Sequence, residues 1–279
     1  MEQIIAGIFR SEVPSLTLPP YQGTQCYWIG DAHDVVLVDT GDGSPGAQSV
    51  LEEDWHHLGR PKVLAVFATH HHDDHSGGGA WAKARWGARL YMNAPDLERL
   101  RERRRDPVDS LWQPYASDAF TVGNMGVTLI NAPGHTPGQW NFWLPAHRVL
   151  LAGDNVLGNT TSVILPPDGD MGLYLGTLAS LRNLRPRLLL PGHGDLVADA
   201  DAYLSRYITH RQERSQEILS ALAQGPREPN SIARVIYRDI LPPEKMWLGE
   251  WMVKGHLDWL SRQQLVVEDN GRFRKVGQS

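Results

Sequence analysis

The stretch from His70 to His75 concentrates side chains that can bind metal ions, in the pattern His-x-His-x-Asp-His. Residues two apart in an extended segment point the same way, so His70 and His72 are expected to hold one ion together. A tight bend would bring Asp74 and His75 round to a second ion, and the Ser-Gly-Gly of residues 76–78 lets the backbone turn into the next helix. Imidazole nitrogen with carboxylate oxygen suits zinc, with manganese and iron as alternatives.

Three further metal-binding side chains stand beside glycines later in the chain. His135 lies in Gly-His-Thr-Pro-Gly, Asp154 in Ala-Gly-Asp-Asn and His193 in Pro-Gly-His-Gly. Each glycine lets its loop approach a crowded centre closely. With twelve histidines and one cysteine, a metal site in this chain must be built from imidazole and carboxylate. Burying so many titratable groups without a metal would be costly, so the pattern predicts a metal centre.

The other histidines and the cysteine carry weaker signals. His71 lies inside the motif, and we expect it to line the pocket rather than point into solvent. Cys26 lies in a predicted strand and is interpreted as a core residue rather than a nucleophile. The remaining histidines are expected to be surface or core residues with satisfied rings, namely His33, His56, His57, His147, His210 and His256.

The sequence around these motifs predicts strands that end at them. Val63–Ala68 is a continuous apolar run, expected to be a strand buried on both faces, and it leads directly into His70. Further strands are expected at 24–40 (two strands around a polar turn), 89–92, 127–131, 141–144, 148–152 and 188–190, and helices at 47–58, 79–86 and 173–184. Strands that release polar loops at their carboxyl ends and alternate with helices predict an α/β layered fold with its site along one edge.

Beyond about residue 203 the pattern changes to helices. They are expected at 202–223, 230–240 (capped by Asn230 and Ser231) and 250–263, and a hairpin with an Asn-Gly turn is expected over 265–276. This order is typical of a winged helix. The predicted organisation is an α/β domain that carries the metal motifs at 1–203 and a winged-helix domain at 204–279. The chain from Ser205 onward has 12 Lys and Arg against 9 Asp and Glu, a net charge of +3; the part before it has 15 against 23, a net charge of −8.

The composition excludes several classes of protein. With 41% hydrophobic residues and a net charge of −5, the chain can bury a core, which excludes intrinsic disorder. Its apolar runs fall far short of the ~20 residues of a membrane span. The N-terminus lacks the basic and apolar segments of a signal peptide, and a single cysteine fits a reducing compartment, so a cytoplasmic location is expected.

Two clusters outside the motifs are expected to be structural. Arginines crowd a predicted helix opened by Pro95, where a solvated helix face is preferred to a phosphate clamp. These arginines are Arg99, Arg101, Arg103, Arg104 and Arg105. Trp247, Trp251 and Trp259 recur at helical spacing and are expected to pack against the core rather than stack on bases.

Over roughly residues 20–200 the motif blocks resemble the metallo-β-lactamase superfamily in order and spacing. The resemblance implies an αββα sandwich with two metals at one edge of its sheets. It also implies that the first metal is held by His70, His72 and His135, the second by Asp74, His75 and His193, and that Asp154 bridges both. Some redox relatives have glutamate at the position of His72, so histidine there favours hydrolysis.

The rest of the chain resembles the lactamase-β-like subfamily, which carries a C-terminal winged helix. Tyr207–Arg214, Tyr237 and the terminal hairpin carry this second resemblance. The subfamily is typified by a mitochondrial endoribonuclease of animals, and some of its fungal members cleave thioesters from carrier proteins.

Together these features imply a dinuclear zinc hydrolase. A metal-bridging hydroxide would attack an ester, thioester or lactone bond of a small molecule, and Asp74 would take its proton. The alternative is a single-strand endoribonuclease that holds RNA with the winged helix. The acidic core disfavours broad RNA contact, so a small-molecule substrate is expected, with no membrane partner and with a homodimer left open.

Overall fold

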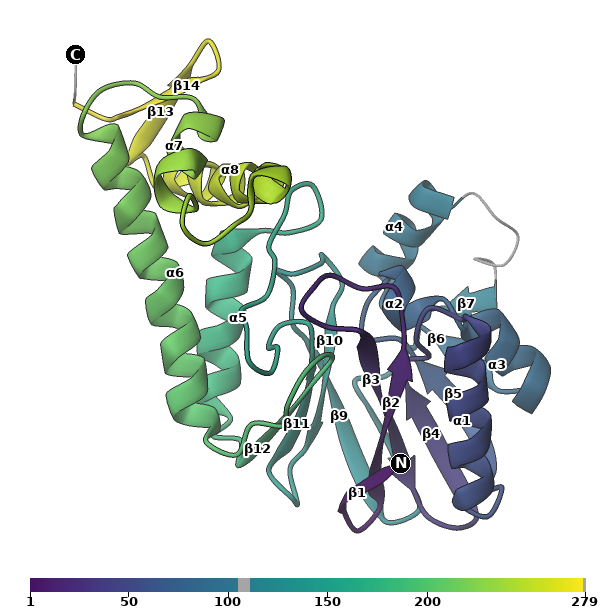
Figure 1. The fold of residues 1–279 in the computed structure, drawn as a ribbon. Coiled ribbons are helices and arrows are strands. Elements are labelled where there is room, and N and C mark those ends of the chain that lie inside the picture. Colours follow the sequence, from purple (N-terminus) through teal and green to yellow (C-terminus); the bar gives the residue numbers. More distant parts are fainter. Residues whose placement is uncertain (105–110, 278–279) are drawn as a thin grey trace. The chain divides into compact units, whose positions relative to one another are not determined.

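The computed structural model describes residues 1–104 and 111–277 and divides into two compact units (Figure 1). The first, called here the sheet unit, comprises Met1–Ala132, Thr136–Thr161 and Arg185–Ala200. The second, called the helical unit, comprises Pro133–His135, Ser162–Leu184 and the chain from Asp201 onward. The short segment Pro133–His135 therefore groups with residues that lie much later in the sequence.

Two sheets make up the sheet unit. The seven-stranded sheet follows chain order: β1 (Glu2–Ile5), β2 (Ile8–Pro14), β3 (Gly23–Gly30), β4 (Asp34–Val38), β5 (Lys62–Phe67), β6 (Arg89–Tyr91) and β7 (Trp112–Gln113). The five-stranded sheet has the order β12 (Leu188–Pro191), β11 (Val149–Gly153), β10 (Trp140–Leu144), β9 (Met125–Asn131) and β8 (Ala119–Val122). Strands β4 to β7 are parallel, as are β11 and β12. Parallel strands release their following loops at the same edge, as the sequence predicts.

The main core lies between the two sheets. Phe67 of β5 meets Phe142 of β10 edge to face, with ring centroids 5.8 Å apart. Ile29 and Leu151 belong to the same cluster of buried side chains, one from each sheet. The expectation that β5 is buried on both faces is wrong at Leu64, whose exposed fraction is 37%.

Helices cover the other face of the seven-stranded sheet. They are α1 (Pro45–His57), α3 (Gly79–Trp86) and α4 (Ala94–Arg104), and a single-turn helix, α2 (Asp73–Ser76), precedes α3. Ser44 caps α1 by accepting a hydrogen bond from the Ala47 N–H, and α3 ends at Gly87, whose φ of 66° favours glycine. Buried Leu51 and Ala82 pack from these helices against Trp28 of β3.

The basic run lies in α4, as expected. Arg101 and Arg103 are exposed, and Arg99 makes a 2.9 Å ion pair with Glu102 one turn along. These three arginines confirm the expectation of a solvated helix face. The side chain of Arg104 and all of Arg105 lie outside the described residues.

The helical unit contains four helices in its described part. They are α5 (Met171–Asn183), α6 (Ala200–Leu222, the first residue of which belongs to the sheet unit), α7 (Pro229–Ile236) and α8 (Met246–Arg262), with a short 3₁₀ turn, η2 (Pro243–Lys245), before α8. Among the described residues, no helix is both long and apolar enough to cross a membrane. The predicted caps at Asn230 and Ser231 are wrong, because α7 already begins at Pro229 after Glu228, where proline suits the first helical position.

Two of the three tryptophans do not pack as expected. The buried face of α8 carries Gly249, Val253, His256 and Leu260, at spacings of three and four residues. Trp247 and Trp251 are two residues out of phase with this face, and their exposed fractions are 53% and 39%. Trp259 does pack against the buried cluster of this unit.

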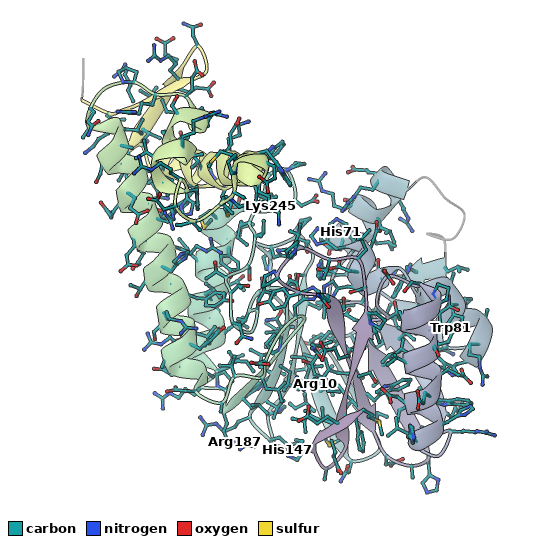
Figure 2. All side chains as sticks on the ribbon, in the orientation of Figure 1. Arg10, His71, Trp81, His147, Arg187 and Lys245 are labelled. Carbon is teal, nitrogen blue, oxygen red and sulfur yellow. The ribbon has the colours of Figure 1, made fainter. Side chains whose placement is uncertain are left out.

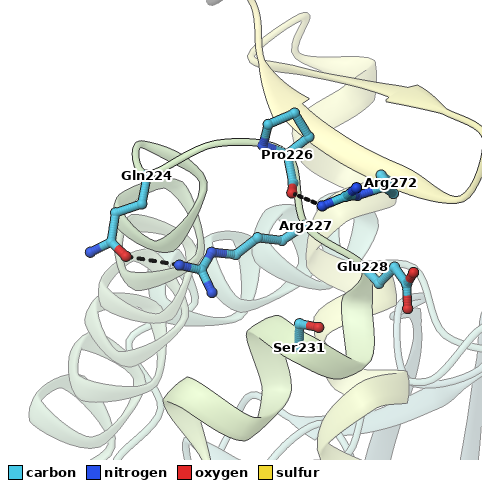
Figure 3. A pocket seen from close by; sticks show the side chains of 6 residues that line it. All are labelled: Gln224, Pro226, Arg227, Glu228, Ser231 and Arg272. Carbon is cyan, nitrogen blue, oxygen red and sulfur yellow. Dashed lines mark hydrogen bonds between the residues drawn. The ribbon is translucent and has the colours of Figure 1, made fainter.

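The chain ends in the predicted hairpin. Strands β13 (Val266–Asp269) and β14 (Arg272–Lys275) pair antiparallel around Asn270 and Gly271, both of which have positive φ. Figure 3 shows how the hairpin joins the connection between α6 and α7: Arg272 donates to the Pro226 carbonyl over 2.8 Å, and Arg227 donates to Gln224 over 2.8 Å. Arg227 and Arg272 both line the pocket drawn in Figure 3. Their guanidinium groups are thus engaged in holding the connection between α6 and α7.

Candidate metal centre

The candidate ligands of the sheet unit follow the carboxyl ends of its parallel strands. Residues 69–75 follow β5, Asp154 follows β11 and His193 follows β12. The chain bends at residues 69–71 instead of remaining extended as predicted, yet His70 Nε2 still lies 2.9 Å from His72 Nδ1. His70 is fully buried and His72 is half-buried.

A second group of donor atoms surrounds His193. Its Nε2 lies 3.1 Å from His75 Nε2, 3.4 Å from Asp74 Oδ2 and 3.5 Å from Asp154 Oδ2. The other oxygen of Asp154 lies 3.3 Å from His75 Nε2. One metal-binding atom from each of His70, His75 and Asp154 also lies within 4.8 Å of the other two. Asp154 is therefore close to His70 as well as to the donor atoms around His193.

Three of these imidazoles, those of His70, His75 and His193, are each oriented by a partner on the nitrogen that points away from the donor cluster. His75 Nδ1 donates to Asp39 over 2.8 Å and His193 Nδ1 donates to the Gly23 carbonyl over 2.7 Å. The hydroxyl of Thr69 donates to Asp39, so it accepts from His70 Nδ1, 3.0 Å away. With Nδ1 protonated, Nε2 of a neutral ring carries a lone pair. Two such lone pairs 3.1 Å apart repel each other unless a cation lies between them.

The spacing of the donor atoms suits a small divalent metal. Ligands at ~2.0–2.1 Å from a tetrahedral zinc ion lie roughly 3.3 Å from one another. The donor pairs above are separated by 2.9 to 3.5 Å. The ring orientations, the donor types and the spacing therefore all fit metal binding.

In the absence of metal, protons take the place of the cation. Burial alone would lower the pKa of His193, but the charge of Asp154 and hydrogen bonds to Asp154 and Asp74 raise it to about 9. Burial likewise opposes protonation of His75, yet Asp154, Asp39 and Asp74 raise its pKa well above the ordinary value. A metal ion must displace these protons to bind.

Zinc binding is therefore expected to release protons and to strengthen with pH. Because His193 has a pKa of about 9, it is protonated at pH 7.5 and must lose its proton to become a ligand. Calorimetric titration in buffers of different ionisation enthalpy should detect about one proton or more released per chain at that pH. Zinc affinity that stays constant between pH 6.5 and 9 would contradict this arrangement.

Asp39 is a functional residue that the sequence interpretation missed. It holds both Thr69 (backbone N–H, 2.7 Å) and His75, and its backbone has a positive φ of 65°. Three hydrogen bonds to its carboxylate keep this uncommon conformation in place. The available signal was its position directly after an apolar strand, the same signal that marks Asp154.

His71 neither lines a pocket nor faces solvent in the sheet unit. It is fully buried, and its Nδ1 lies 3.2 Å from the carboxylate of Asp96, which is also fully buried (His71 is labelled in Figure 2). Asp96, in the first turn of α4, also accepts from the His71 and Gly138 N–H groups and from the Thr136 hydroxyl. It therefore ties together the loops that follow β5 and β9, and sequence reasoning missed it.

His135 belongs to the helical unit and is held there by its own partner. Its Nδ1 lies 2.9 Å from the Val163 carbonyl, to which it donates. Like the other ligand candidates, it thereby presents Nε2 as an acceptor.

The remaining histidines are surface or core residues as expected, but the expectation of satisfied rings is wrong for His210 and His256, because Nδ1 of His210 and Nε2 of His256 are buried without a hydrogen-bond partner among the described residues. His33, His56, His57 and His147 are exposed, and His210 is half-buried. His256 is fully buried, with its Nδ1 2.9 Å from the Ser215 hydroxyl. Burial, assisted by the charges of Arg211 and Arg214, lowers the pKa of His256 to about 3, so it is neutral at physiological pH.

Comparison with known proteins agrees with this geometry. Residues 20–193 match the family model of the metallo-beta-lactamase superfamily. The beta-lactamase-like protein 2 homolog of Drosophila melanogaster is 28% identical, over 87% of this chain and 83% of that protein. An atrochrysone carboxyl ACP thioesterase of Aspergillus chevalieri is also 28% identical, over 75% of this chain and 63% of that protein, so the chain spans under two thirds of its length.

Solved structures show the same fold. A beta-lactamase domain protein from Burkholderia ambifaria superimposes with a TM-score of 0.87 at 21% identity, covering 98% of this chain and 93% of that one. The mixed α/β sandwich expected from the sequence is thus confirmed.

Proposed function

This chain belongs to the metallo-β-lactamase superfamily of hydrolases, and from that membership we propose that it uses two zinc ions to cleave an acyl bond, a thioester above all. The observation that carries the proposal is the convergence of imidazole nitrogens and carboxylate oxygens within 2.9 to 3.5 Å. The imidazoles of His70, His75 and His193 are each oriented by a separate acceptor, which is typical of metal-binding histidines.

The proposed ligand assignment follows the resemblance residue by residue. The first metal takes His70, His72 and His135, the second takes Asp74, His75 and His193, and Asp154 bridges the two. Nitrogen and carboxylate oxygen donors are the ligands of catalytic zinc, which also needs a position open to water or substrate. With the shared Asp154, each metal would have four protein ligands, and water or substrate would add a fifth.

Bound metals in such a site make water nucleophilic at neutral pH and polarise the scissile carbonyl. The chain's own residues supply orientation and proton transfer. Burial would raise the pKa of Asp74, but neighbouring His75 and His193 lower it below the ordinary range, so its carboxylate is ionised. Because Oδ2 faces the donor cluster, the other carboxylate oxygen, Oδ1, would be the one to accept a proton. At 15% exposed, the Asp74 side chain is near enough to solvent to pass that proton on.

Cys26 is unsuited to covalent catalysis. Its side chain is fully buried in β3, and burial, reinforced by the charge of Asp39, raises the pKa of its thiol. A thiol that stays protonated is a poor nucleophile. Catalysis is therefore assigned to the metal centre alone.

A thioester is preferred because one relative is named as a thioesterase and because the acidic N-terminal part of the chain, residues 1–204, suits a polyanion poorly. The chain up to residue 204 has a net charge of −8, which would repel an RNA backbone. The alternative, single-strand RNA cleavage, would depend on the basic residues of the terminal hairpin.

The purified, zinc-loaded protein should be assayed in parallel on a thioester, an ester, a lactone, a β-lactam and a labelled single-stranded RNA. We expect the thioester to give a kcat/KM at least about tenfold above the RNA, or ~1.4 kcal/mol in transition-state free energy. Replacing Arg272, Arg274 and Lys275 together by glutamine should change thioester turnover by no more than about twofold, because these residues lie on the surface hairpin.

The opposite pattern would favour the ribonuclease. RNA turnover equal to that of the best acyl substrate, lost in the hairpin variant and falling steeply with salt, would show that phosphate contacts drive binding. His72→Ala serves as the inactive reference for both assays.

A further inference from the structure

The segment Pro133–His135 is anchored by residues of the helical unit. Thr177 of α5 donates its hydroxyl to the Pro133 carbonyl over 2.7 Å, and the Asp170 N–H donates to the Gly134 carbonyl over 2.9 Å. Gly134, with φ of 136°, packs so closely on α5 that a Cβ there would lie 2.3 Å from Tyr174 Cα. The backbone on which His135 stands is therefore fixed by α5.

The imidazole of His135 is fixed from a different side. Its acceptor is the Val163 carbonyl, and the neighbouring Ser162 carbonyl accepts a hydrogen bond from Nη2 of Arg211 in α6. The guanidinium of Arg211 also lies over the ring of Tyr174, 5.5 Å from its centroid. Arg211 thus contacts both the carbonyl segment that orients His135 and the residue against which Gly134 packs.

Burying the charged side chain of Arg211 at this position costs free energy. It is only 2% exposed, its Nε has no hydrogen-bond partner, and no carboxylate of the described chain lies within ion-pair distance of it. A buried, uncompensated guanidinium does not favour folding, and an apolar residue of similar size is often tolerated as well or better. Its presence at this position is therefore better explained by a role other than stability.

We infer that Arg211 is a positioning residue: by holding the Ser162 carbonyl, it fixes the segment whose next carbonyl, that of Val163, sets the orientation in which His135 offers Nε2 to a metal. The inference rests on the proposed function, because only there is His135 a metal ligand. The inference gives a role to Arg211, which lies in the Tyr207–Arg214 stretch and takes no part in the proposed hydrolysis. Outer partners of metal-bound histidines typically contribute 10- to 100-fold to metal affinity.

The test measures zinc affinity in Arg211→Met, which keeps the length of the side chain and removes its donors. We expect one of the two zinc sites to weaken by about 10- to 100-fold while the other is unchanged. The visible spectrum of the cobalt-substituted protein should change in the bands of that same site. Arg211→Lys, which keeps one donor group, should recover part of the affinity.

Arg214→Met is the matched control. Arg214 lies one turn further along α6, where it pairs with Glu217 and covers the ring of Tyr237, away from the Ser162 carbonyl. Equal zinc affinities in the two methionine variants would overturn the inference, as would an unchanged affinity in Arg211→Met. If Arg211→Met does not fold, the same comparison is made with Arg211→Lys, which must then bind zinc more weakly than Arg214→Lys.

His135→Ala separates failure of the inference from failure of the proposed function. If His135→Ala retains two tightly bound zinc ions, the ligand assignment itself is wrong. If His135→Ala loses a zinc ion and Arg211→Met binds both as the unaltered protein does, only the role of Arg211 is refuted.

Discussion

Replacing Asp154 by asparagine is expected to lower kcat/KM on the best substrate by more than about 100-fold and to reduce bound zinc below two ions per chain. Loss of a residue that only orients a ligand costs about 10- to 100-fold, so loss of a direct ligand should cost more. The carboxylate oxygens of Asp154 lie within 3.5 Å of Nε2 of both His75 and His193. Asp154 also has an oxygen within 4.8 Å of a ring nitrogen of His70. An amide keeps the size of this side chain but removes the charge that offsets the metal ions.

Elemental analysis and steady-state kinetics on the same preparation measure both effects. Asp118→Asn provides the control, because Asp118 is an exposed aspartate of the sheet unit outside the ligand cluster. If Asp154→Asn kept two zinc ions and near-normal activity, the dinuclear assignment would be untenable.

The second large effect is on stability. Asp96→Ala is expected to lower the free energy of unfolding by about 3–5 kcal/mol, since removing one partner of a buried charged network leaves the others unsatisfied. The carboxylate is fully buried, and its loss would strand the backbone N–H groups of His71 and Gly138 and the Thr136 hydroxyl. Urea unfolding of the zinc-free protein measures this change without a contribution from metal binding.

Asp96→Asn separates the charge of this network from its hydrogen bonds. The amide oxygen can still accept from one or two of these donors, so the asparagine variant should lie between the unaltered protein and the alanine variant. An alanine variant as stable as the unaltered protein would show that water satisfies these donors.

The sequence predicted the strands of the site well, because each is an apolar run that ends abruptly at a polar loop. β3, β4, β5, β9, β10, β11 and β12 are all at their expected places. β1, β7 and β8 were not predicted, because strands of two to four residues carry little hydrophobic pattern. The longer β2 was not predicted either, because Arg10, Ser11 and Glu12 interrupt its apolar residues.

The candidate ligands could be picked out from the sequence, whereas the residues that orient them could not. Histidine spacing and flanking glycines mark the candidate ligands, whereas Asp39 and Asp96 are single aspartates whose partners lie far along the chain. Their importance comes from burial and from bonds across the fold, which a pattern of neighbouring residues does not encode. The same limit explains Trp247 and Trp251, whose spacing shows that they share a helix face but not which way that face points.

The dependence of His135 on α5 and α6 has a consequence for how the protein is made. A chain leaves the ribosome from its N-terminus, so the ligands up to His193 emerge before Arg211 has been synthesised. Until α6 forms, the Ser162 carbonyl lacks the guanidinium that holds it, and on our inference the orientation of His135 is not yet fixed. If His135 binds the first metal as proposed, that site would be completed only when the C-terminal helices have been translated, which would tie metal loading to the end of synthesis.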